Sequence, residues 1–125
     1  MIARDLLYEG KAKKVFLTDR DDRYLIRYKD DATAFNGEKK GSIIGKGAIN
    51  NTMSAYFFQL LQSEGVESHF VEQTSSTEMV VRRVEIIPLE VIVRNIAAGS
   101  MSARLGIAEG TQLARPVVEF SYKRD

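Results

Sequence analysis

A glycine followed by lysines near the N-terminus is the first group of residues that could do chemistry. Gly10-Lys11-Ala12-Lys13-Lys14 lies between two strand-like runs. A small residue at such a turn lets backbone N–H groups approach a phosphate, and the lysines add positive charge. A glycine hairpin with solvated lysines explains the same letters. Local spacing alone favours the hairpin, and phosphate binding remains an alternative.

A second glycine-rich stretch, residues 41–47, contains two features of a phosphate-binding P-loop, a glycine pair and a lysine. The P-loop needs four residues between its glycines, and a Ser or Thr after the lysine to bind Mg²⁺. Here three residues separate Gly41 from Gly45, and Gly47 follows Lys46. We therefore do not interpret the stretch as a P-loop.

The run from residue 86 to residue 100 is the most informative part of the chain. Glu90 and Arg94 fall on one face of a predicted strand, because side chains alternate along a strand. The guanidinium suits recognition of a carboxylate or phosphate, and a nearby carboxylate can orient it. The small residues from Ala97 to Gly99 let a ligand lie close, and Ser100 adds a hydroxyl and a helix start. An exposed ion pair followed by a turn is an equally good interpretation.

The composition excludes several other functions. The sequence has no cysteine, which excludes disulfides, Cys-ligated zinc and thiol catalysis, and the single His69 excludes a multi-histidine metal site within the chain. The formal net charge of +1 is smaller than a non-specific nucleic-acid binder would carry. The N-terminus does not read as a signal peptide, and no apolar run reaches the ~18 residues of a membrane span. We therefore expect a soluble, cytoplasmic domain that binds neither nucleic acid nor a membrane.

Lysine and arginine are unevenly distributed, and none occurs between Lys46 and Arg82. They gather at Lys11/Lys13/Lys14, Lys39/Lys40/Lys46, Arg82/Arg83, Arg94 and Lys123/Arg124. Charges that avoid a buried helix and its neighbours explain this pattern. A phosphate-rich ligand site that draws several clusters together explains it equally well.

Short strands are the elements that must position these residues. The patterns of β-branched and apolar residues predict strands at 6–8, 13–17, 24–28, 69–73, 79–84, 89–94 and 117–122. Polar residues predict a turn at 19–22, a second turn at 74–77, and a long glycine-rich loop over 29–47.

One long helix is predicted after that loop, and a helical turn near the C-terminus. Apolar residues recur at steps of three and four, so this stripe is expected to face a sheet; it comprises Ile49, Met53, Tyr56, Phe57, Leu60 and Leu61. Gly65 suits the left-handed position after the last turn, and Gly106 ends a helical turn over 100–105. Strands around one helix without regular alternation indicate an α+β fold.

The sequence IIPLEVIVRNIAAGS, residues 86–100, resembles the first signature of the phosphoribosylaminoimidazole-succinocarboxamide synthase (SAICAR synthase) family, ligases of purine biosynthesis. The positions that fit are Pro88, Glu90, Arg94, Ala98, Gly99 and Ser100. The resemblance extends to LLYEGKAKKVF near the start, ATAFNG at 32–37, GKGAINN at 45–51, SARLGIAEG at 102–110 and VVEFSYKRD at the end. It covers essentially the whole chain.

This resemblance implies a fold and a reaction. The expected fold is an antiparallel sheet packed on one main helix, a kinase-like N-terminal lobe, followed by the start of a second, α/β portion. The implied reaction joins L-aspartate to the carboxylate of carboxyaminoimidazole ribonucleotide, with ATP and Mg²⁺. A carboxylate is a poor acyl donor, so an acyl phosphate supplies the leaving group that the aspartate amine displaces. The enzyme then acts mainly by alignment and charge neutralisation.

The resemblance also assigns ATP-binding residues. Gly10, Lys11, Ala12 and Lys13 resemble the nucleotide loop, with Lys13 toward the phosphates, and Val15 resembles an adenine-packing position. The segment from Arg82 through Val84 to Glu85 resembles a hinge-like strand whose backbone meets the adenine edge. Lys123 stands where the family has a lysine near the ATP phosphates, so Lys13 and Lys123 are the catalytic candidates.

The ribonucleotide-binding candidates are Glu90, Arg94, Gly99 and Ser100. Arg94 and Ser100 resemble ligands of the ribonucleotide's phosphate or carboxylate, and Glu90 is expected to support Arg94. His69 has no role in the family pattern, so we expect it to be structural.

The family pattern continues for about as many residues again, with a second signature that carries metal-binding carboxylates. These residues are not in this sequence, so no metal ligand is expected in this chain. We interpret residues 1–125 as the N-terminal, nucleotide-binding portion of a truncated or divided enzyme, incomplete as a catalyst by itself. A non-catalytic nucleotide-binding module is the alternative. Association with a second copy or with the missing half is left open.

Overall fold

The computed structural model describes residues 1–34 and 37–123, which form two compact units. The first unit is Met1–Val84 and the second is Glu85–Asp125. Within the part of the chain that is described, no helix is long and apolar enough to cross a membrane. Both units are built on antiparallel strands, as the predicted α+β class requires.

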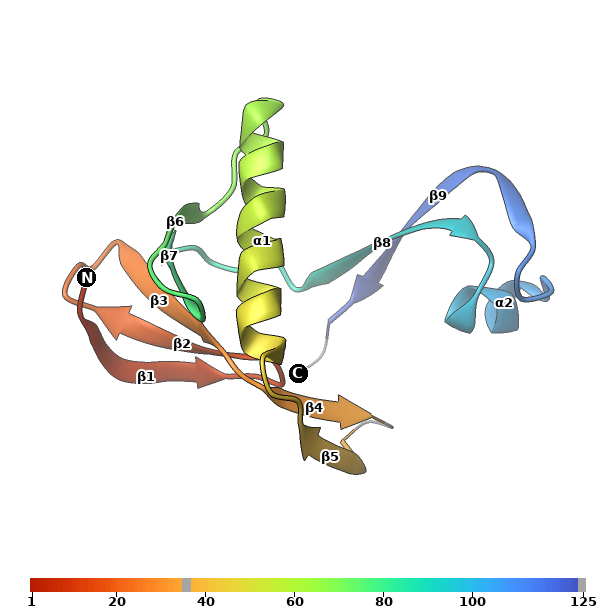
Figure 1. Cartoon of the computed structure of the whole chain (residues 1–125). Coiled ribbons are helices and arrows are strands. Elements are labelled where there is room, and N and C mark those ends of the chain that lie inside the picture. Colours follow the sequence, from red (N-terminus) through yellow and green to blue (C-terminus); the bar gives the residue numbers. More distant parts are fainter. Residues whose placement is uncertain (35–36, 124–125) are drawn as a thin grey trace. The chain divides into compact units, whose positions relative to one another are not determined.

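An antiparallel sheet of five strands forms the first unit (Figure 1). Its strands are β1 (Ala3–Glu9), β2 (Lys13–Thr18), β3 (Arg23–Tyr28), β6 (Phe70–Gln73) and β7 (Glu78–Arg82), in the order β1-β2-β3-β7-β6. The register aligns Val15, Ile26 and Met79 across three neighbouring strands. Because side chains alternate, these apolar residues share one face, where Ile26 and Met79 are buried. The predicted strands of this unit are confirmed, although β7 ends at Arg82 rather than at residue 84.

The prediction of a continuous loop over residues 29–47 is wrong. Two short strands, β4 (Asp31–Ala34) and β5 (Lys39–Ser42), pair there as a separate antiparallel ribbon. The ribbon carries alanine, glycine and lysine, so it has no apolar alternation from which a strand could be predicted. Residues 35 and 36 of the ATAFNG motif lie outside the described part of the chain.

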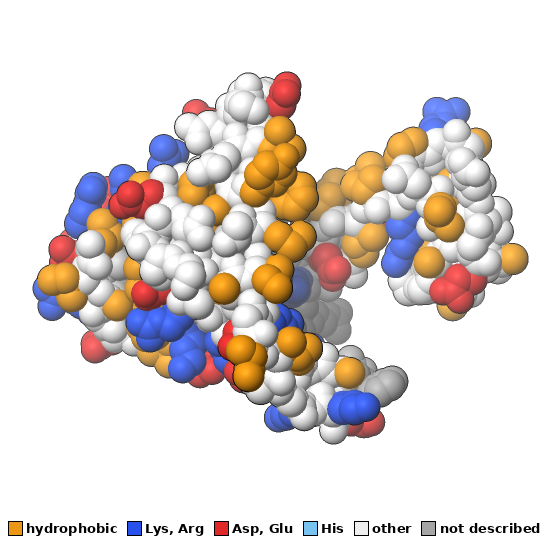
Figure 2. Space-filling model, in the orientation of Figure 1, with side chains coloured by type: hydrophobic (Ala, Val, Ile, Leu, Met, Phe, Trp, Pro, Cys, Tyr) orange, Lys and Arg blue, Asp and Glu red, His pale blue; other side chains and the backbone are white. Residues whose placement is uncertain are grey.

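Helix α1 (Lys46–Ser63) covers one face of the sheet with a different side from the one predicted. Its buried residues are Gly47, Asn51 and Ala55. The predicted stripe is exposed instead, with exposed fractions from 42% at Leu61 to 61% at Ile49. At 100° per residue the two sets lie on roughly opposite sides of the helix. Small residues face the sheet because they let the helix approach it closely. Figure 2 shows that apolar side chains remain on the surface of the first unit.

Close contacts at the start of α1 fix that approach. Asp30 accepts hydrogen bonds from the backbone N–H groups of Gly47, at 2.8 Å, and Gly45, at 3.3 Å. A methyl group added at Gly47 would lie 2.7 Å from the carbonyl oxygen of Tyr28. At the other end of α1, Gly65 has a φ of 81°, which confirms its predicted left-handed conformation.

The second unit is a two-stranded ribbon with a short helix. Strands β8 (Leu89–Ile96) and β9 (Gln112–Tyr122) pair in antiparallel register, and helix α2 (Gly99–Leu105) lies in the connection (Figure 1). The predicted strands are confirmed but are longer than predicted. The helical turn is also confirmed, with Gly106 at a φ of 65° after its last residue.

Candidate functional site

The turn between β1 and β2 is a tight hairpin. The N–H group of Gly10 donates to the carbonyl oxygen of Lys13 at 2.9 Å, so this N–H is already used within the turn. The side chain of Lys29 holds the turn from the neighbouring strand, with its Nζ 3.2 Å from the carbonyl oxygen of Gly10. The N–H of Lys29 also donates to the carbonyl oxygen of Ala12 at 2.8 Å. The geometry thus contains the predicted hairpin, held by Lys29, the residue that follows β3.

Lys29 was not singled out from the sequence, because its role depends on the strand pairing. Its Nζ lies 2.7 Å from Glu9 and 3.1 Å from Asp31. The hydrogen bond to Glu9, followed by the one to Asp31, raises the pKa of Lys29 above its ordinary value. Lys29 is therefore neutralised by carboxylates and acts as a clamp on the turn.

Lys13 differs from Lys29 in having no counterion among the residues that the structure describes. It lies on the face of the sheet that carries Val15, because the two residues alternate along β2. No Asp or Glu among the described residues lies within 4.0 Å of its ammonium, and helix α1 contains no acidic residue. Burial lowers the pKa of Lys13, since desolvation penalises the charged form. A half-buried cation without a carboxylate partner is a group that an anionic ligand can neutralise.

His69 takes part in packing near the same face. Its ring meets the ring of Phe58 edge to face, with 5.2 Å between centroids. Burial, and secondarily the positive charge of Lys13, lower the pKa of His69. The lowered pKa favours a neutral His69, and the contact with Phe58 indicates a structural position.

Strand β2 runs from the hairpin toward the end of the sheet at which β7 ends, with β3 between them. Lys13 lies opposite Tyr28, and four residues later Leu17 lies opposite Tyr24, which pairs with Val81. Four residues of strand span about 13 Å. Lys13 and Val15 therefore share one face of β2, and β3 separates the end of that strand from Arg82, where the predicted hinge segment begins.

In the predicted hinge segment, some backbone N–H groups donate hydrogen bonds within the first unit and others do not. The N–H of Arg82 donates to His69 at 2.7 Å and that of Arg83 donates to Asp22 at 2.9 Å. No described residue accepts a hydrogen bond from the N–H groups of Val84 or Glu85. The boundary between the two units falls between these two residues. Of the predicted segment, only Val84 and Glu85 keep backbone donors for another molecule.

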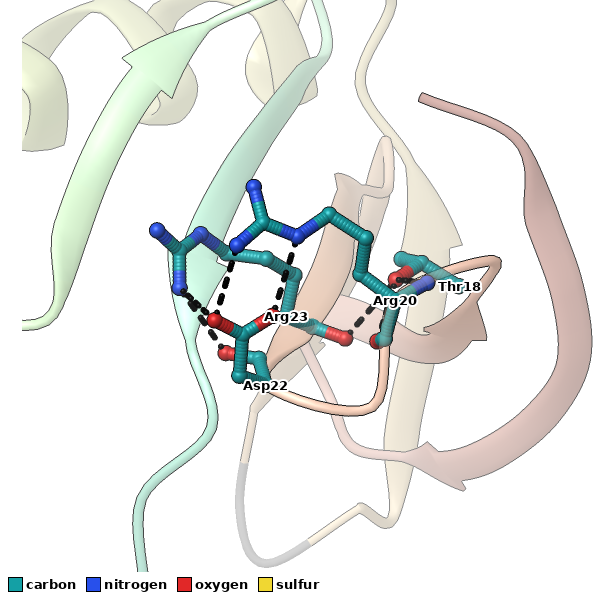
Figure 3. Close-up of polar contacts among 4 residues, drawn as sticks. All are labelled: Thr18, Arg20, Asp22 and Arg23. Carbon is teal, nitrogen blue, oxygen red and sulfur yellow. Dashed lines mark hydrogen bonds and ion pairs between the residues drawn. The ribbon is translucent and has the colours of Figure 1, made fainter.

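A separate polar network fixes the turn between β2 and β3 (Figure 3). Asp22 lies 2.9 Å from both Arg20 and Arg23, and the Thr18 hydroxyl lies 2.9 Å from the carbonyl oxygens of the same two arginines. The network borders an open cavity of about 510 Å³, and Arg83 is the one residue of the predicted hinge segment among those that line it. Since its charges are paired locally, we assign it to turn structure.

In the second unit, the structure brings Arg94 to the start of α2. A methyl group added at Gly99 would lie 3.4 Å from Nη2 of Arg94. The N–H of Gly99 donates to Glu109 at 3.3 Å. Ser100 follows in the first turn of α2 and is exposed. Three of the four predicted ribonucleotide-binding residues, Arg94, Gly99 and Ser100, therefore gather at this end of the ribbon.

The prediction that Glu90 supports Arg94 is wrong. The carboxylate that contacts Arg94 belongs to Glu119, with 3.7 Å between Nη1 and Oε1. Residues four apart on one strand are about 13 Å apart, too far for an ion pair. Glu119 lies opposite Ile92 on β9, diagonal to Arg94 and within reach of a long side chain. Sequence reasoning missed Glu119 because the register of β8 and β9 is a property of the fold.

Lys123 lies at the other end of the ribbon from Arg94. Its N–H donates to the carbonyl oxygen of Pro88 at 2.9 Å, next to the pair formed by Leu89 and Tyr122. The second unit thus separates Lys123, beside the segment that follows Glu85, from the cluster at Arg94. The described residues include no group of three or more His, Asp or Glu side chains that could hold a metal ion.

Comparison with known proteins gives one consistent result. The sequence pattern of the SAICAR synthetase family matches residues 6–125. A phosphoribosylaminoimidazole-succinocarboxamide synthase of Coprothermobacter proteolyticus is 65% identical over 97% of this chain, which spans 51% of that relative. The chain therefore spans about half the length of the curated relatives it matches.

Solved structures of the family have the same fold. A phosphoribosylaminoimidazole-succinocarboxamide synthase from Ehrlichia chaffeensis superposes with a TM-score of 0.90 at 40% identity, over 96% of this chain and 51% of that one. A SAICAR synthetase in complex with ADP superposes with a TM-score of 0.87 at 44% identity, over 94% of this chain and 50% of that one. The predicted α+β fold with a kinase-like N-terminal lobe is confirmed. The matched residues and the shared fold together show that the chain belongs to the SAICAR synthetase family.

Proposed function

We propose that this chain is the N-terminal portion of a phosphoribosylaminoimidazole-succinocarboxamide synthase and provides its nucleotide and ribonucleotide sites. In that reaction a carboxylate oxygen of carboxyaminoimidazole ribonucleotide attacks the γ-phosphorus of ATP and ADP leaves. The aspartate amine then attacks the acyl carbon, an amide bond forms, and phosphate and a proton are released. Lys13 carries the proposal, because a half-buried ammonium without a carboxylate partner suits a phosphate.

The nucleotide is proposed to lie along β2. The phosphates would meet Lys13, with Gly10, Lys11 and Ala12 forming the turn beside them, and the adenine would pack on Val15. The free backbone donors of Val84 and Glu85 could meet the adenine edge, while the N–H groups of Arg82 and Arg83 are occupied. A span of about 13 Å from Lys13 to Leu17 suits a nucleotide in extended form. A related SAICAR synthetase has been solved in complex with ADP, which supports nucleotide binding by this family.

The ribonucleotide is proposed to bind at the end of the β8–β9 ribbon. The guanidinium of Arg94 would bind its phosphate or carboxylate, and Ser100 would add a hydroxyl. Gly99 leaves room for a ligand beside Arg94, because a side chain at this position would lie against the guanidinium. Glu90 lies further along the ribbon and is exposed. It would therefore take part only by contacting the ligand itself, and not by orienting Arg94.

Lys123 and Mg²⁺ complete the proposal. Lys123 is proposed as the second catalytic residue, because it stands where the family has a lysine near the ATP phosphates. The described residues do not form a metal site, so we propose that the Mg²⁺ ligands belong to the remaining half of the enzyme and derive no step through the metal.

The nucleotide site can be tested by calorimetric titration of the 125-residue chain with ADP. Lys13→Ala is expected to weaken binding about tenfold, the equivalent of about 1.4 kcal/mol, because it removes a phosphate partner. Lys14→Ala is the matched control, since Lys14 alternates to the other face of β2. Equal losses for the two variants would remove Lys13 from the site.

Catalysis can be tested with the chain alone and with the C-terminal half of the Coprothermobacter relative fused to it. We expect the fusion to form the ligase product from ATP, the ribonucleotide and aspartate, and the chain alone to form none. Product formation by the chain alone would show that it needs no second half. ADP binding without product from a folded fusion would favour the alternative function, a non-catalytic nucleotide-binding module, since the chain spans about half of its relatives.

A further inference from the structure

Glu119 joins two arginines of the second unit. Its Oε2 accepts a hydrogen bond from Nη2 of Arg104 at 2.7 Å, and its Oε1 faces Nη1 of Arg94 at 3.7 Å. The side chains of Arg94 and Glu119 are about one-fifth exposed, at 21% and 23%, whereas that of Arg104 is 53% exposed. Glu119 thus binds the outer arginine directly and attracts the inner one across a longer gap.

The contact with Arg94 leaves hydrogen-bonding capacity unused. A distance of 3.7 Å is too long for a hydrogen bond. Nη1 of Arg94 and Oε1 of Glu119 are both buried, and neither has a hydrogen-bond partner among the described residues. A buried donor or acceptor without a partner is costly unless a ligand or water satisfies it, and an anion can satisfy the N–H of Arg94. Glu109 adds a second carboxylate beside Gly99, so the unused N–H of Arg94, rather than a surplus of positive charge, is the feature that suits an anion.

We propose that Glu119 is a positioning residue for Arg94 in ribonucleotide binding, an inference that rests on the proposed function. Glu119 attracts the guanidinium of Arg94 and keeps it beside Gly99. Arg104 occupies the other carboxylate oxygen, so Glu119 orients Arg94 without using up its donors. Arg94 therefore stays ordered and still has N–H groups for the phosphate or carboxylate of the ligand.

Positioning and simple charge predict opposite effects for Glu119→Gln. This change removes a negative charge close to an anion site, so charge alone would make an anion bind more tightly. If Glu119 positions Arg94, the same change releases the guanidinium and the anion binds more weakly. The sign of the change separates the two explanations.

The first measurement needs no ligand. The ¹⁵N–¹H signals of the Arg94 guanidinium are recorded in the 125-residue chain, with SAICAR absent. We expect resolved, slowly rotating Nη signals in the original chain and averaged signals in Glu119→Gln. Glu67→Gln is the control, since it makes the same chemical change at an exposed residue of the first unit. Unchanged Arg94 signals in Glu119→Gln would overturn the proposal.

The second measurement is a titration with SAICAR, followed through the amide signals of Gly99 and Ser100. Glu119→Gln is expected to raise the dissociation constant about tenfold, the size of one lost charge-assisted hydrogen bond. In an Arg94→Ala background the same change should have no further effect, because Glu119 acts through Arg94. Tighter binding by Glu119→Gln, or an equal loss in the Arg94→Ala background, would contradict a positioning role.

Folding and the proposed function are checked separately. Amide signals of Val93 and Val118, which pair across the ribbon, report whether each variant keeps β8 and β9 together. If Glu119→Gln loses this pairing, Glu119→Asp replaces it, and a shorter carboxylate should order Arg94 partially. If SAICAR leaves the amide signals of Gly99 and Ser100 unchanged in the original chain, the proposal of a ribonucleotide site at these residues is wrong. Release of Arg94 in Glu119→Gln would then still establish that Glu119 holds it.

Discussion

At the scale of single residues, Lys13 and Lys29 show how environment decides the role of a side chain. Both are lysines near the same hairpin. Lys29 lies against Glu9 and Asp31, which raise its pKa, whereas burial without a counterion lowers the pKa of Lys13. Lys29 is therefore committed to structure, and Lys13 is the one available to a ligand.

The lowered pKa of Lys13 predicts a pH dependence of ADP binding. Without ligand, Lys13 loses its proton below the ordinary lysine value of 10.5. A bound phosphate favours the ammonium, so affinity should fall as the pH rises through this lowered pKa. Titrations at increasing alkaline pH measure the fall, which should be absent in Lys13→Ala. The same fall in that variant would assign the titration to another group.

The same shift predicts the sign of a stability change. Between the lowered folded pKa of Lys13 and 10.5, the unfolded chain binds more protons than the folded chain. The contribution of Lys13 to the free energy of unfolding therefore increases with pH across this window. Urea unfolding of the original chain and of Lys13→Ala, at matched pH values, isolates that contribution. A difference between the two that decreases with pH would contradict it.

At the scale of elements, the contact between α1 and the sheet depends on Asn51. Its side chain is fully buried, and its Nδ2 lies 3.0–3.2 Å from the carbonyl oxygens of Ser75, Ser76 and Glu78. These bonds tie the helix to the turn between β6 and β7. They also explain why a polar residue occupies the middle of the buried side of the helix.

Asn51→Ala is expected to lower the free energy of unfolding by about 1–3 kcal/mol, because the hydrogen bonds from the buried Asn51 amide to the turn between β6 and β7 are lost. Asn50→Ala is the matched control, since Asn50 is the neighbouring asparagine and has no hydrogen bond from its side chain in the described structure. Urea unfolding monitored by circular dichroism gives both values. Similar losses would show that helix propensity, rather than these bonds, determines the effect.

The approach of α1 to the sheet also depends on Gly47. Alanine is the better helix former, yet its methyl group would lie 2.7 Å from a backbone oxygen of Tyr28. Gly47→Ala is therefore expected to destabilise the first unit by about 1–3 kcal/mol through overpacking. Gly41→Ala serves as the control, because no atom lies within 4 Å of the added methyl. A stabilised Gly47→Ala variant would mean that the helix shifts freely.

At the scale of the whole molecule, the two units differ in how much core they contain. In the first unit, Leu25, Ile26, Ala55 and the run from Met79 to Val81 are buried. In the second, the buried apolar residues among those described are Ala97 and Met101. Folding stability should therefore reside mainly in the first unit, while the ribbon carries the proposed ribonucleotide site.

Amide hydrogen exchange of the 125-residue chain tests this division. We expect the slowest exchange in β3 and β7, which contain most of the buried residues, and fast exchange in β8 and β9. A peptide covering residues 1–84 should keep the protection of the first unit. Equal protection of both units would show that they unfold together.

The strand and helix types, the family and the gathering of Arg94, Gly99 and Ser100 could be predicted from the sequence. Local patterns suffice for these, because alternation, turn residues and short motifs are properties of neighbouring positions. The buried side of α1 could not be predicted, because small and polar residues make the contact that the apolar stripe was expected to make. The β4–β5 ribbon was missed because nothing apolar marks it.

The sequence by itself singled out residues of a type that can bind anions, Lys13 and Arg94 with the glycines beside them, and the resemblance to the family supplied their predicted roles. Only the tertiary structure decided which partners they have. Among the described residues, it placed no carboxylate at Lys13, placed two at Lys29, and made Glu119 rather than Glu90 the neighbour of Arg94. The physical reason is that ion pairs form across strands, over distances that depend on register, whereas residues along one strand move apart by about 3.3 Å per position.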